Sequence, residues 1–204
     1  LVKFCLSKEE HPRIQGIVYK NQVEKNNYPC EINLKQLKSP FMQSEFQEMF
    51  QKQVFIRWET KRGCYYKCSY CQHAGNIPKV LEFDMARISQ EINFICKNKQ
   101  IQDIAVLDPV FNCGSTHLLV LKELIDGKYS GTINFQIRLE LINEEFLSNI
   151  QKLNLTAKVV LEAGIQSIHE KEQIVIRRQM KMEIIKSKIQ LILQKKIQLE
   201  ISLI

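Results

Sequence analysis

Three cysteines that lie close together are the residues of this 204-residue chain best suited to do chemistry. Cys64, Cys68 and Cys71 are separated by three and then by two residues, so their thiolates can converge from one compact loop. Thiolates are ligands of both iron–sulfur clusters and zinc. The other four cysteines are scattered, and an odd total of seven without a secretory signal argues against a disulfide framework. We therefore expect a cytoplasmic protein with a metal or cluster site at residues 64–71.

The spacing alone leaves three kinds of site open. A structural zinc site needs four protein ligands, and His73 is the candidate for the fourth, although a lone histidine in a loop is more often simply exposed. An electron-transfer 4Fe-4S cluster normally uses four cysteines. Three cysteines on such a cluster leave one iron open for a ligand, and reductive activation of a bound molecule requires an open iron of that kind.

Strands and helices are predicted to alternate after residue 53 and to position this loop. Apolar runs predict strands at 54–58, 104–107, 132–139, 158–161 and 197–203. Amphipathic stretches predict helices at 84–98, 115–126, 143–153 and 171–196, with Asp84 and Asn143 as N-caps. Strict alternation favours an α/β fold: a partial (β/α) TIM-like barrel of about five strands, with its chemistry at the carboxyl ends of the strands.

The cysteine loop in this context resembles the radical S-adenosylmethionine (SAM) superfamily. In that family a CxxxCxxC loop follows the first barrel strand and has an aromatic residue before the third cysteine, the place of Tyr70 here. The resemblance implies that Cys64, Cys68 and Cys71 hold a 4Fe-4S cluster whose open iron binds SAM. It also implies that an electron from the cluster cleaves SAM to a 5′-deoxyadenosyl radical. The sequence departs from the family at Tyr65, where relatives usually have proline.

Polar residues near the ends of the second and third predicted strands are implied by the same resemblance to contact SAM. Asp108 begins an Asp-x-x-Phe-Asn segment that resembles the cobalamin-binding branch of the superfamily, although Asp and Pro are also ordinary turn formers. Gln136, Arg138 and Glu140 alternate along the third strand and should project to one face. Relatives often have glutamate where Gln136 stands. Arg138 is expected to meet the SAM carboxylate in a bidentate pair, and the alternative is that this face simply meets solvent.

The fourth predicted strand ends in Glu-Ala-Gly-Ile-Gln-Ser at 162–167, which looks like the family's Glu-x-Gly-[Ile/Leu/Val]-Gln-Ser segment. Gly164 would allow the backbone to approach a ligand closely. Arg178 lies eleven residues after Ser167, where relatives carry an arginine. The residues expected to contact SAM are Tyr70, Asp108, Arg138, Glu140, Glu162, Gln166 and Arg178.

The first fifty residues are polar and interrupted by prolines. Segments 12–20 and 37–41 resemble the tail of a cobalamin-binding domain and the linker that follows it. We expect residues 1–50 to be an irregular linker, left from a cobalamin-binding domain that is missing, and residues 51–204 to be a radical SAM core truncated at its C-terminus. The chain starts without methionine and ends within a predicted strand, so both ends look cut.

Composition and charge exclude some classes of protein and disfavour others. Hydrophobic residues make up 45% of the chain, which excludes wholesale disorder, and no apolar run approaches the ~18–20 residues that span a bilayer. The net charge of +7 is concentrated at residues 171–196, which contain eight Lys or Arg and two Asp or Glu. Isoleucines recur there at helical spacing, so a solvated helix face is favoured over a nucleic-acid-binding surface.

The sequence therefore predicts a radical SAM enzyme with a 4Fe-4S cluster and SAM as cofactors, an external electron donor and an unknown substrate. Methyl transfer that depends on cobalamin is a further expectation from the resemblance. One alternative is a tRNA-modifying enzyme similar to methylthiotransferases, which the basic helix motivates. Another is a non-catalytic, truncated iron–sulfur protein, because the predicted barrel stops after five strands.

Overall fold

The computed structural model describes residues 33–71 and 80–203. The chain divides into two compact units, Leu1–Asn33 and Leu34–Ile204, and almost all of the first lies outside the described residues. The segment 12–20 and His73 also lie outside them, so the predictions made for both stay predictions. The predicted division into a linker at 1–50 and a radical SAM core at 51–204 stays a prediction.

A parallel five-stranded sheet forms the centre of the larger unit, as the alternating pattern predicts. Its order is β1-β4-β5-β6-β7, and each neighbouring pair is parallel. The strands are β1 (Phe55–Trp58), β4 (Asp103–Val106), β5 (Thr132–Ile137), β6 (Lys158–Gln166) and β7 (Gln198–Leu203).

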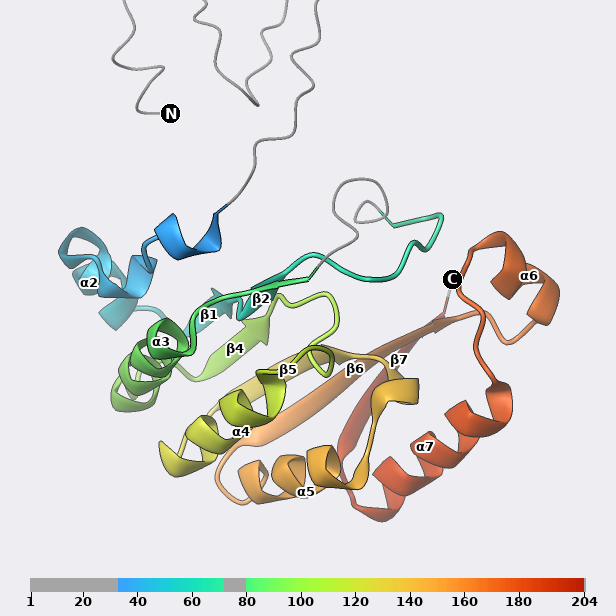
Figure 1. The fold of residues 1–204 in the computed structure, drawn as a ribbon. Coiled ribbons are helices and arrows are strands. Elements are labelled where there is room, and N and C mark those ends of the chain that lie inside the picture. Colours follow the sequence, from blue (N-terminus) through green and yellow to red (C-terminus); the bar gives the residue numbers. More distant parts are fainter. Residues whose placement is uncertain (1–32, 72–79, 204) are drawn as a thin grey trace, which may run out of the picture. The chain divides into compact units, whose positions relative to one another are not determined.

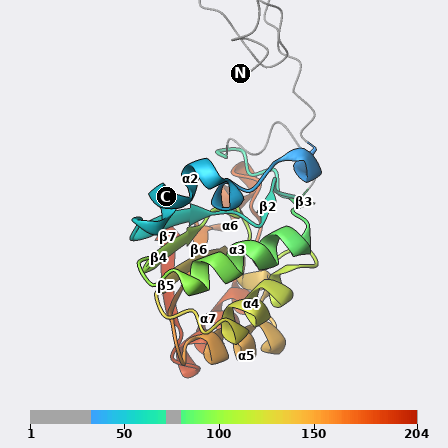
Figure 2. The same ribbon diagram turned by 90° about the vertical axis from the view of Figure 1, so that its left-hand side faces the viewer.

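Four helices cover one face of this sheet (Figures 1 and 2). They are α3 (Met85–Lys97), α4 (His117–Asp126), α5 (Glu144–Leu153) and α7 (Met182–Gln194). The predicted N-caps are confirmed: Asp84 accepts the Ala86 N–H at 2.8 Å, and Asn143 accepts that of Phe146 at 2.8 Å. Alternate strand residues point under the helices and form the core with them, among them Ile56, Trp58, Ile104, Val106, Ile133, Phe135, Val159 and Leu161.

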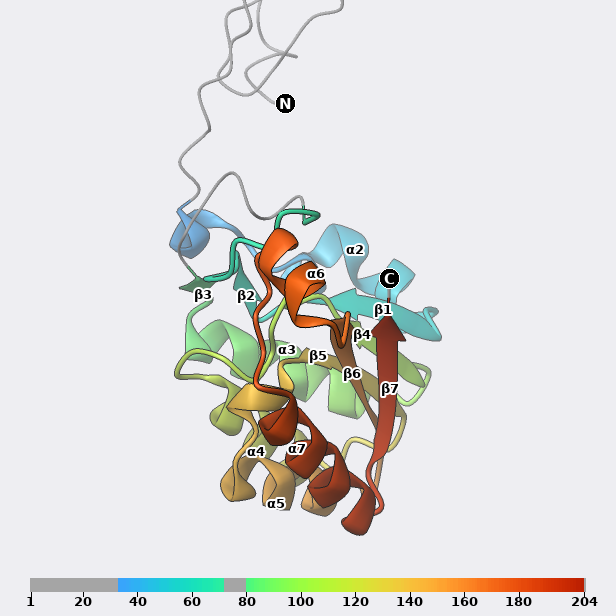
Figure 3. The ribbon, with the colours of Figure 1, turned by 90° about the vertical axis from the view of Figure 1, so that its right-hand side faces the viewer.

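The opposite face of the sheet is not covered by helices in the described part of the chain (Figure 3). Strands β1 and β7 are the two edges of the sheet, so the sheet of the described residues is open and does not close into a barrel. No helix of the described residues is long and apolar enough to cross a membrane.

Two predicted elements were wrong in extent. The predicted basic helix at 171–196 is two helices, α6 (Glu170–Val175) and α7, because the chain turns at Arg177, whose φ of 52° is left-handed. The third strand ends at Ile137, and Leu139–Leu141 is a 3-10 turn, so Glu140 does not lie on a strand. Strand β5 ends here because the Asn112 side chain binds the backbone of Arg138. It donates to the Arg138 C=O and accepts the Arg138 N–H, at 2.9 Å each.

Two further regions contain elements that were not expected. Residues 34–51 contain 3-10 turns at Leu34–Gln36 and Pro40–Met42 and the helix α2 (Ser44–Gln51), so this part of the predicted linker is not irregular. Phe41 is buried and contacts the rings of Phe50 and Phe94, which attaches the segment to the core. A short antiparallel pair, β2 (Lys61–Arg62) with β3 (Leu81–Glu82), brackets the cysteine loop.

Candidate functional site

A cavity of about 420 Å³ lies where the cysteine loop passes over the carboxyl ends of β4, β5 and β6. All three clustered cysteines line it, and so do five of the seven residues predicted to contact SAM. Those five are Tyr70, Arg138, Glu162, Gln166 and Arg178. Residues from segments more than a hundred positions apart therefore meet in one pocket, at the edge of the sheet where parallel α/β folds place their ligands.

The cysteine loop is shaped by its own backbone. Gly63, with a φ of 90°, turns the chain out of β2, a conformation that few residues other than glycine adopt readily. The Cys71 N–H donates to the Cys68 carbonyl at 3.1 Å, which forms a tight turn between the second and third thiols. Cys68 is buried, whereas Cys64 and Cys71 are half-buried. Burial raises the pKa of the Cys64 thiol, and the neighbouring thiols of Cys68 and Cys71 raise it further.

The side chain of Asp108 binds the backbone at the start of the cysteine loop. Its carboxylate is fully buried and accepts the Thr60 N–H at 2.7 Å, the Lys61 N–H at 3.1 Å and the Thr60 hydroxyl. Burial raises the pKa of this carboxyl despite these hydrogen bonds. The side chain does not line the cavity, although its neighbours Leu107 and Pro109 do. The structure therefore gives Asp108 a positioning contact, and its predicted contact with SAM stays a prediction.

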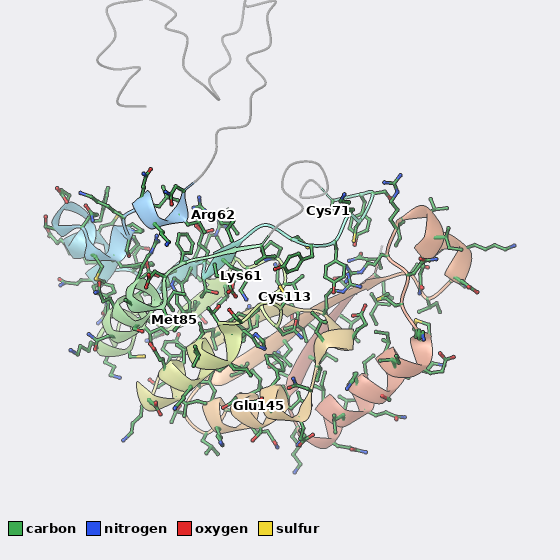
Figure 4. All side chains as sticks on the ribbon, in the orientation of Figure 1. Lys61, Arg62, Cys71, Met85, Cys113 and Glu145 are labelled. Atoms are coloured by element: carbon green, nitrogen blue, oxygen red, sulfur yellow. The ribbon has the colours of Figure 1, made fainter. Side chains whose placement is uncertain are left out.

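Lys61 and Glu82 fasten the same region to the segment after β4. Lys61 is almost fully buried, and its Nζ donates to the carbonyls of Phe111, at 2.9 Å, and Cys113, at 2.5 Å (Figure 4). It lies 3.8 Å from the carboxylate of Glu82, its partner across the β2–β3 pair. Glu82 in turn accepts the N–H groups of Ser115 and Thr116 at 3.0 and 3.2 Å. One ion pair thus joins the base of the cysteine loop to the segment that enters α4.

The pKa of Glu82 predicts a loss of stability in acid. Burial raises this pKa, but the hydrogen bonds from Ser115 and Thr116, with Lys61 nearby, outweigh it and leave the pKa below its ordinary value. The stabilisation is therefore complete above the pKa of an unfolded glutamate, about 4.3, and is lost as the pH falls through the lower folded value. We expect the free energy of unfolding of the wild type to fall across this range, and that of Glu82→Gln to change less. Urea titrations of both proteins from pH 6 to pH 3 measure the difference, and parallel curves would contradict it.

Arg138 faces the cavity from the end of β5. Its guanidinium stacks 3.7 Å above the ring of Tyr66, which lies between the first two cysteines, and pairs with Glu140 at 2.5 Å. Burial raises the pKa of Glu140, but the hydrogen bond from Arg138 outweighs it, so the pKa lies below its ordinary value. Glu140 does not itself line the cavity. It fixes the arginine, whose remaining N–H groups suit a carboxylate ligand.

The end of β6 forms the opposite wall. A Cβ at Gly164 would lie too close to the side-chain amide of Gln166, so a larger residue here would displace that amide. Gln166 has a φ of 70°, an uncommon backbone conformation for a residue other than glycine that often marks a ligand site. Arg178 donates to the Gly164 carbonyl, and its Nη1 lies 3.7 Å from the Cys68 sulfur. Its Nε is buried without a partner.

The donor set fits an iron–sulfur cluster, since thiolates are the usual ligands of such clusters. His73, the candidate fourth ligand of a zinc site, lies outside the described residues, so the zinc alternative stays open. In a cubane cluster each thiolate binds a different iron, so the thiolates stand farther apart than the ligands of one ion do. Three thiols on one cavity, with the unpartnered Arg178 Nε beside them, fit a bulky group that carries negative charge.

Several residues of the site escaped sequence reasoning. Tyr66 and Ser202 line the cavity, but neither was singled out, and the position of Tyr66 inside the cysteine motif is the only signal that could have found it. No sequence pattern pointed to Lys61 or Glu82, because they pair across two strands of only two residues each. Cys96 and Cys113 are buried and do not line the cavity.

Comparisons with known proteins find one relative by sequence and several by fold. No protein-family model matches the chain. Over 75 residues it is 31% identical to the curated 2-(S-pantetheinyl)-carbapenam-3-carboxylate methyltransferase of Streptantibioticus cattleyicolor, a stretch that is 36% of this chain and 11% of that protein.

Solved structures show the same fold. The TM-score is 0.63 to the radical SAM methyltransferase TsrM from Kitasatospora setae with cobalamin and a [4Fe-4S] cluster bound, at 16% identity, covering 77% of this chain and 32% of that one. It is 0.60 to the cobalamin-dependent radical SAM enzyme OxsB with aqua-cobalamin and SAM bound, at 16% identity, covering 72% and 23%. The chain has the fold of cobalamin-dependent radical SAM enzymes. It spans less than a third of the length of TsrM and OxsB.

Proposed function

We propose that this chain is the core of a radical SAM enzyme, with Cys64, Cys68 and Cys71 as the ligands of a 4Fe-4S cluster. The observation that carries the proposal is their convergence on one cavity with Arg138, Gln166 and Arg178, at the edge of the sheet where such folds bind ligands. The bound cluster would supply the electron that cleaves SAM.

The chain's own side chains would bind and orient SAM. The guanidinium of Arg138, held by Glu140 and stacked on Tyr66, would pair with the SAM carboxylate. Glu162 and Gln166 supply acceptors and donors on the β6 wall, and Tyr70 supplies an aromatic face beside Cys71. The fold of the solved structures and the curated methyltransferase support methyl transfer through cobalamin as the reaction of the whole protein.

Anaerobic reconstitution with iron and sulfide tests the proposal. We expect broad visible absorption and about four iron and four sulfide per chain. After reduction, the electron paramagnetic resonance spectrum of the cluster should change when SAM is added, because SAM binds the open iron. Stoichiometric zinc in place of iron would overturn cluster binding. A cluster whose spectrum does not change when SAM is added would overturn the enzymatic proposal and favour a non-catalytic iron–sulfur protein.

A further inference from the structure

The segment around α6 is hydrogen-bonded directly to the cysteine loop. Ser69, between the second and third cysteines, donates its N–H to the Ile176 carbonyl at 3.0 Å and its hydroxyl to the Val175 carbonyl at 3.1 Å. These two carbonyls lie at the C-terminal end of α6, which contributes no residue to the predicted SAM contacts. The cysteine loop is therefore held from this side as well as from its base.

The same segment brings a cation to one of the thiols. Arg178 follows these carbonyls, and its guanidinium spans from the Gly164 carbonyl on β6 to a point 3.7 Å from the Cys68 sulfur. Cys68 is only 5% exposed, so water competes little for this contact. The guanidinium is thus positioned to donate to the sulfur of a bound cluster ligand.

Gln173 fixes the path of the segment. Its side chain is 3% exposed and bridges the two ends of the α6 region: Nε2 donates to the Ser167 carbonyl at 2.9 Å, and Oε1 accepts the Met180 N–H at 3.0 Å. Its backbone carbonyl accepts the Arg178 N–H at 2.9 Å. The buried side chain and the backbone carbonyl of Gln173 therefore fix the path of the chain at Arg178.

We propose that Arg178 raises the reduction potential of the cluster by donating to the Cys68 thiolate, with Gln173 and Ser69 as positioning residues. The inference rests on the proposed function, because it presumes the cluster. One-electron reduction adds negative charge to the cluster and its thiolates. A cationic donor at a sulfur stabilises the reduced form more than the oxidised one, and hydrogen bonds to sulfur are an established lever on such potentials.

The first test compares midpoint potentials of the reconstituted chain by redox titration. Arg178→Met should lower the equilibrium constant for reduction about tenfold, which for one electron is about 59 mV toward more negative potential. Arg178→Lys, which keeps a charged donor, should recover part of the shift. Arg177→Met removes the same charge from the exposed neighbouring residue and should leave the potential unchanged.

The second test separates positioning from general stability. Gln173→Leu and Ser69→Ala should each shift the potential in the same direction by a smaller amount, at full iron content. Gln179→Leu, at an exposed position of the same segment, is the matched control and should not. If the wild type binds no cluster, the proposed function fails. If it binds one, and Arg178→Met has the wild-type potential or Arg177→Met shifts it equally, this inference is wrong and the proposed function stands.

Discussion

Replacing any one of Cys64, Cys68 or Cys71 by alanine is expected to lower the affinity of the chain for iron in anaerobic reconstitution by at least about 100-fold. That factor is the upper range for losing a group that merely supports a ligand, and each of these cysteines would be a ligand itself. The three thiols line one cavity, and two remaining thiolates cannot hold three irons of a cubane. Iron and sulfide content and visible absorption measure the loss.

Cys96→Ala is the matched control, since this thiol is buried on α3 away from the cavity. It should retain the iron content of the wild type. A single loop variant that keeps a full cluster would show that the thiol it lacks is not a ligand. Loss of iron in Cys96→Ala as well would show that the loop variants report unfolding instead.

Replacing Asp108 by alanine is expected to lower the free energy of unfolding by about 3–5 kcal/mol. The substitution leaves the buried N–H groups of Thr60 and Lys61 without their acceptor and removes the partner of the Thr60 hydroxyl. Because these residues begin the cysteine loop, cluster occupancy should fall with stability. Urea unfolding of the chain without cluster measures the first effect, and iron content after reconstitution measures the second.

Asp126→Ala serves as the control for this change. Asp126 is exposed at the end of α4, so its removal should change the free energy of unfolding by less than about 0.5 kcal/mol. An Asp108→Ala protein as stable as the control would contradict the positioning role. If Asp108→Ala is destabilised as expected but still takes up a full cluster, the network serves the fold without shaping the loop.

Some of the fold could be predicted because local signals agreed with the tertiary outcome. The helix α3 begins at Asp84 and α5 at Asn143 because a side-chain acceptor at the cap satisfies a free N–H in any context. The five strands were predicted from apolar runs, and parallel pairing followed from their alternation with helices. Two predictions of extent failed: the distant residue Asn112 ended β5 early, and a local turn at Arg177 divided the basic helix.

The sequence by itself determined that three thiols lie in one loop and that Arg138 and Gln166 lie at the ends of strands that share an edge. Short-range spacing and the period of the strands carry that information. Only the tertiary structure decided which groups act together. It directed Asp108 inward to the backbone of Thr60 and Lys61, paired Lys61 with Glu82, and set Arg178 against Cys68. These contacts join residues 21 to 110 positions apart, and no local propensity encodes them, because packing of the whole sheet brings the groups within reach.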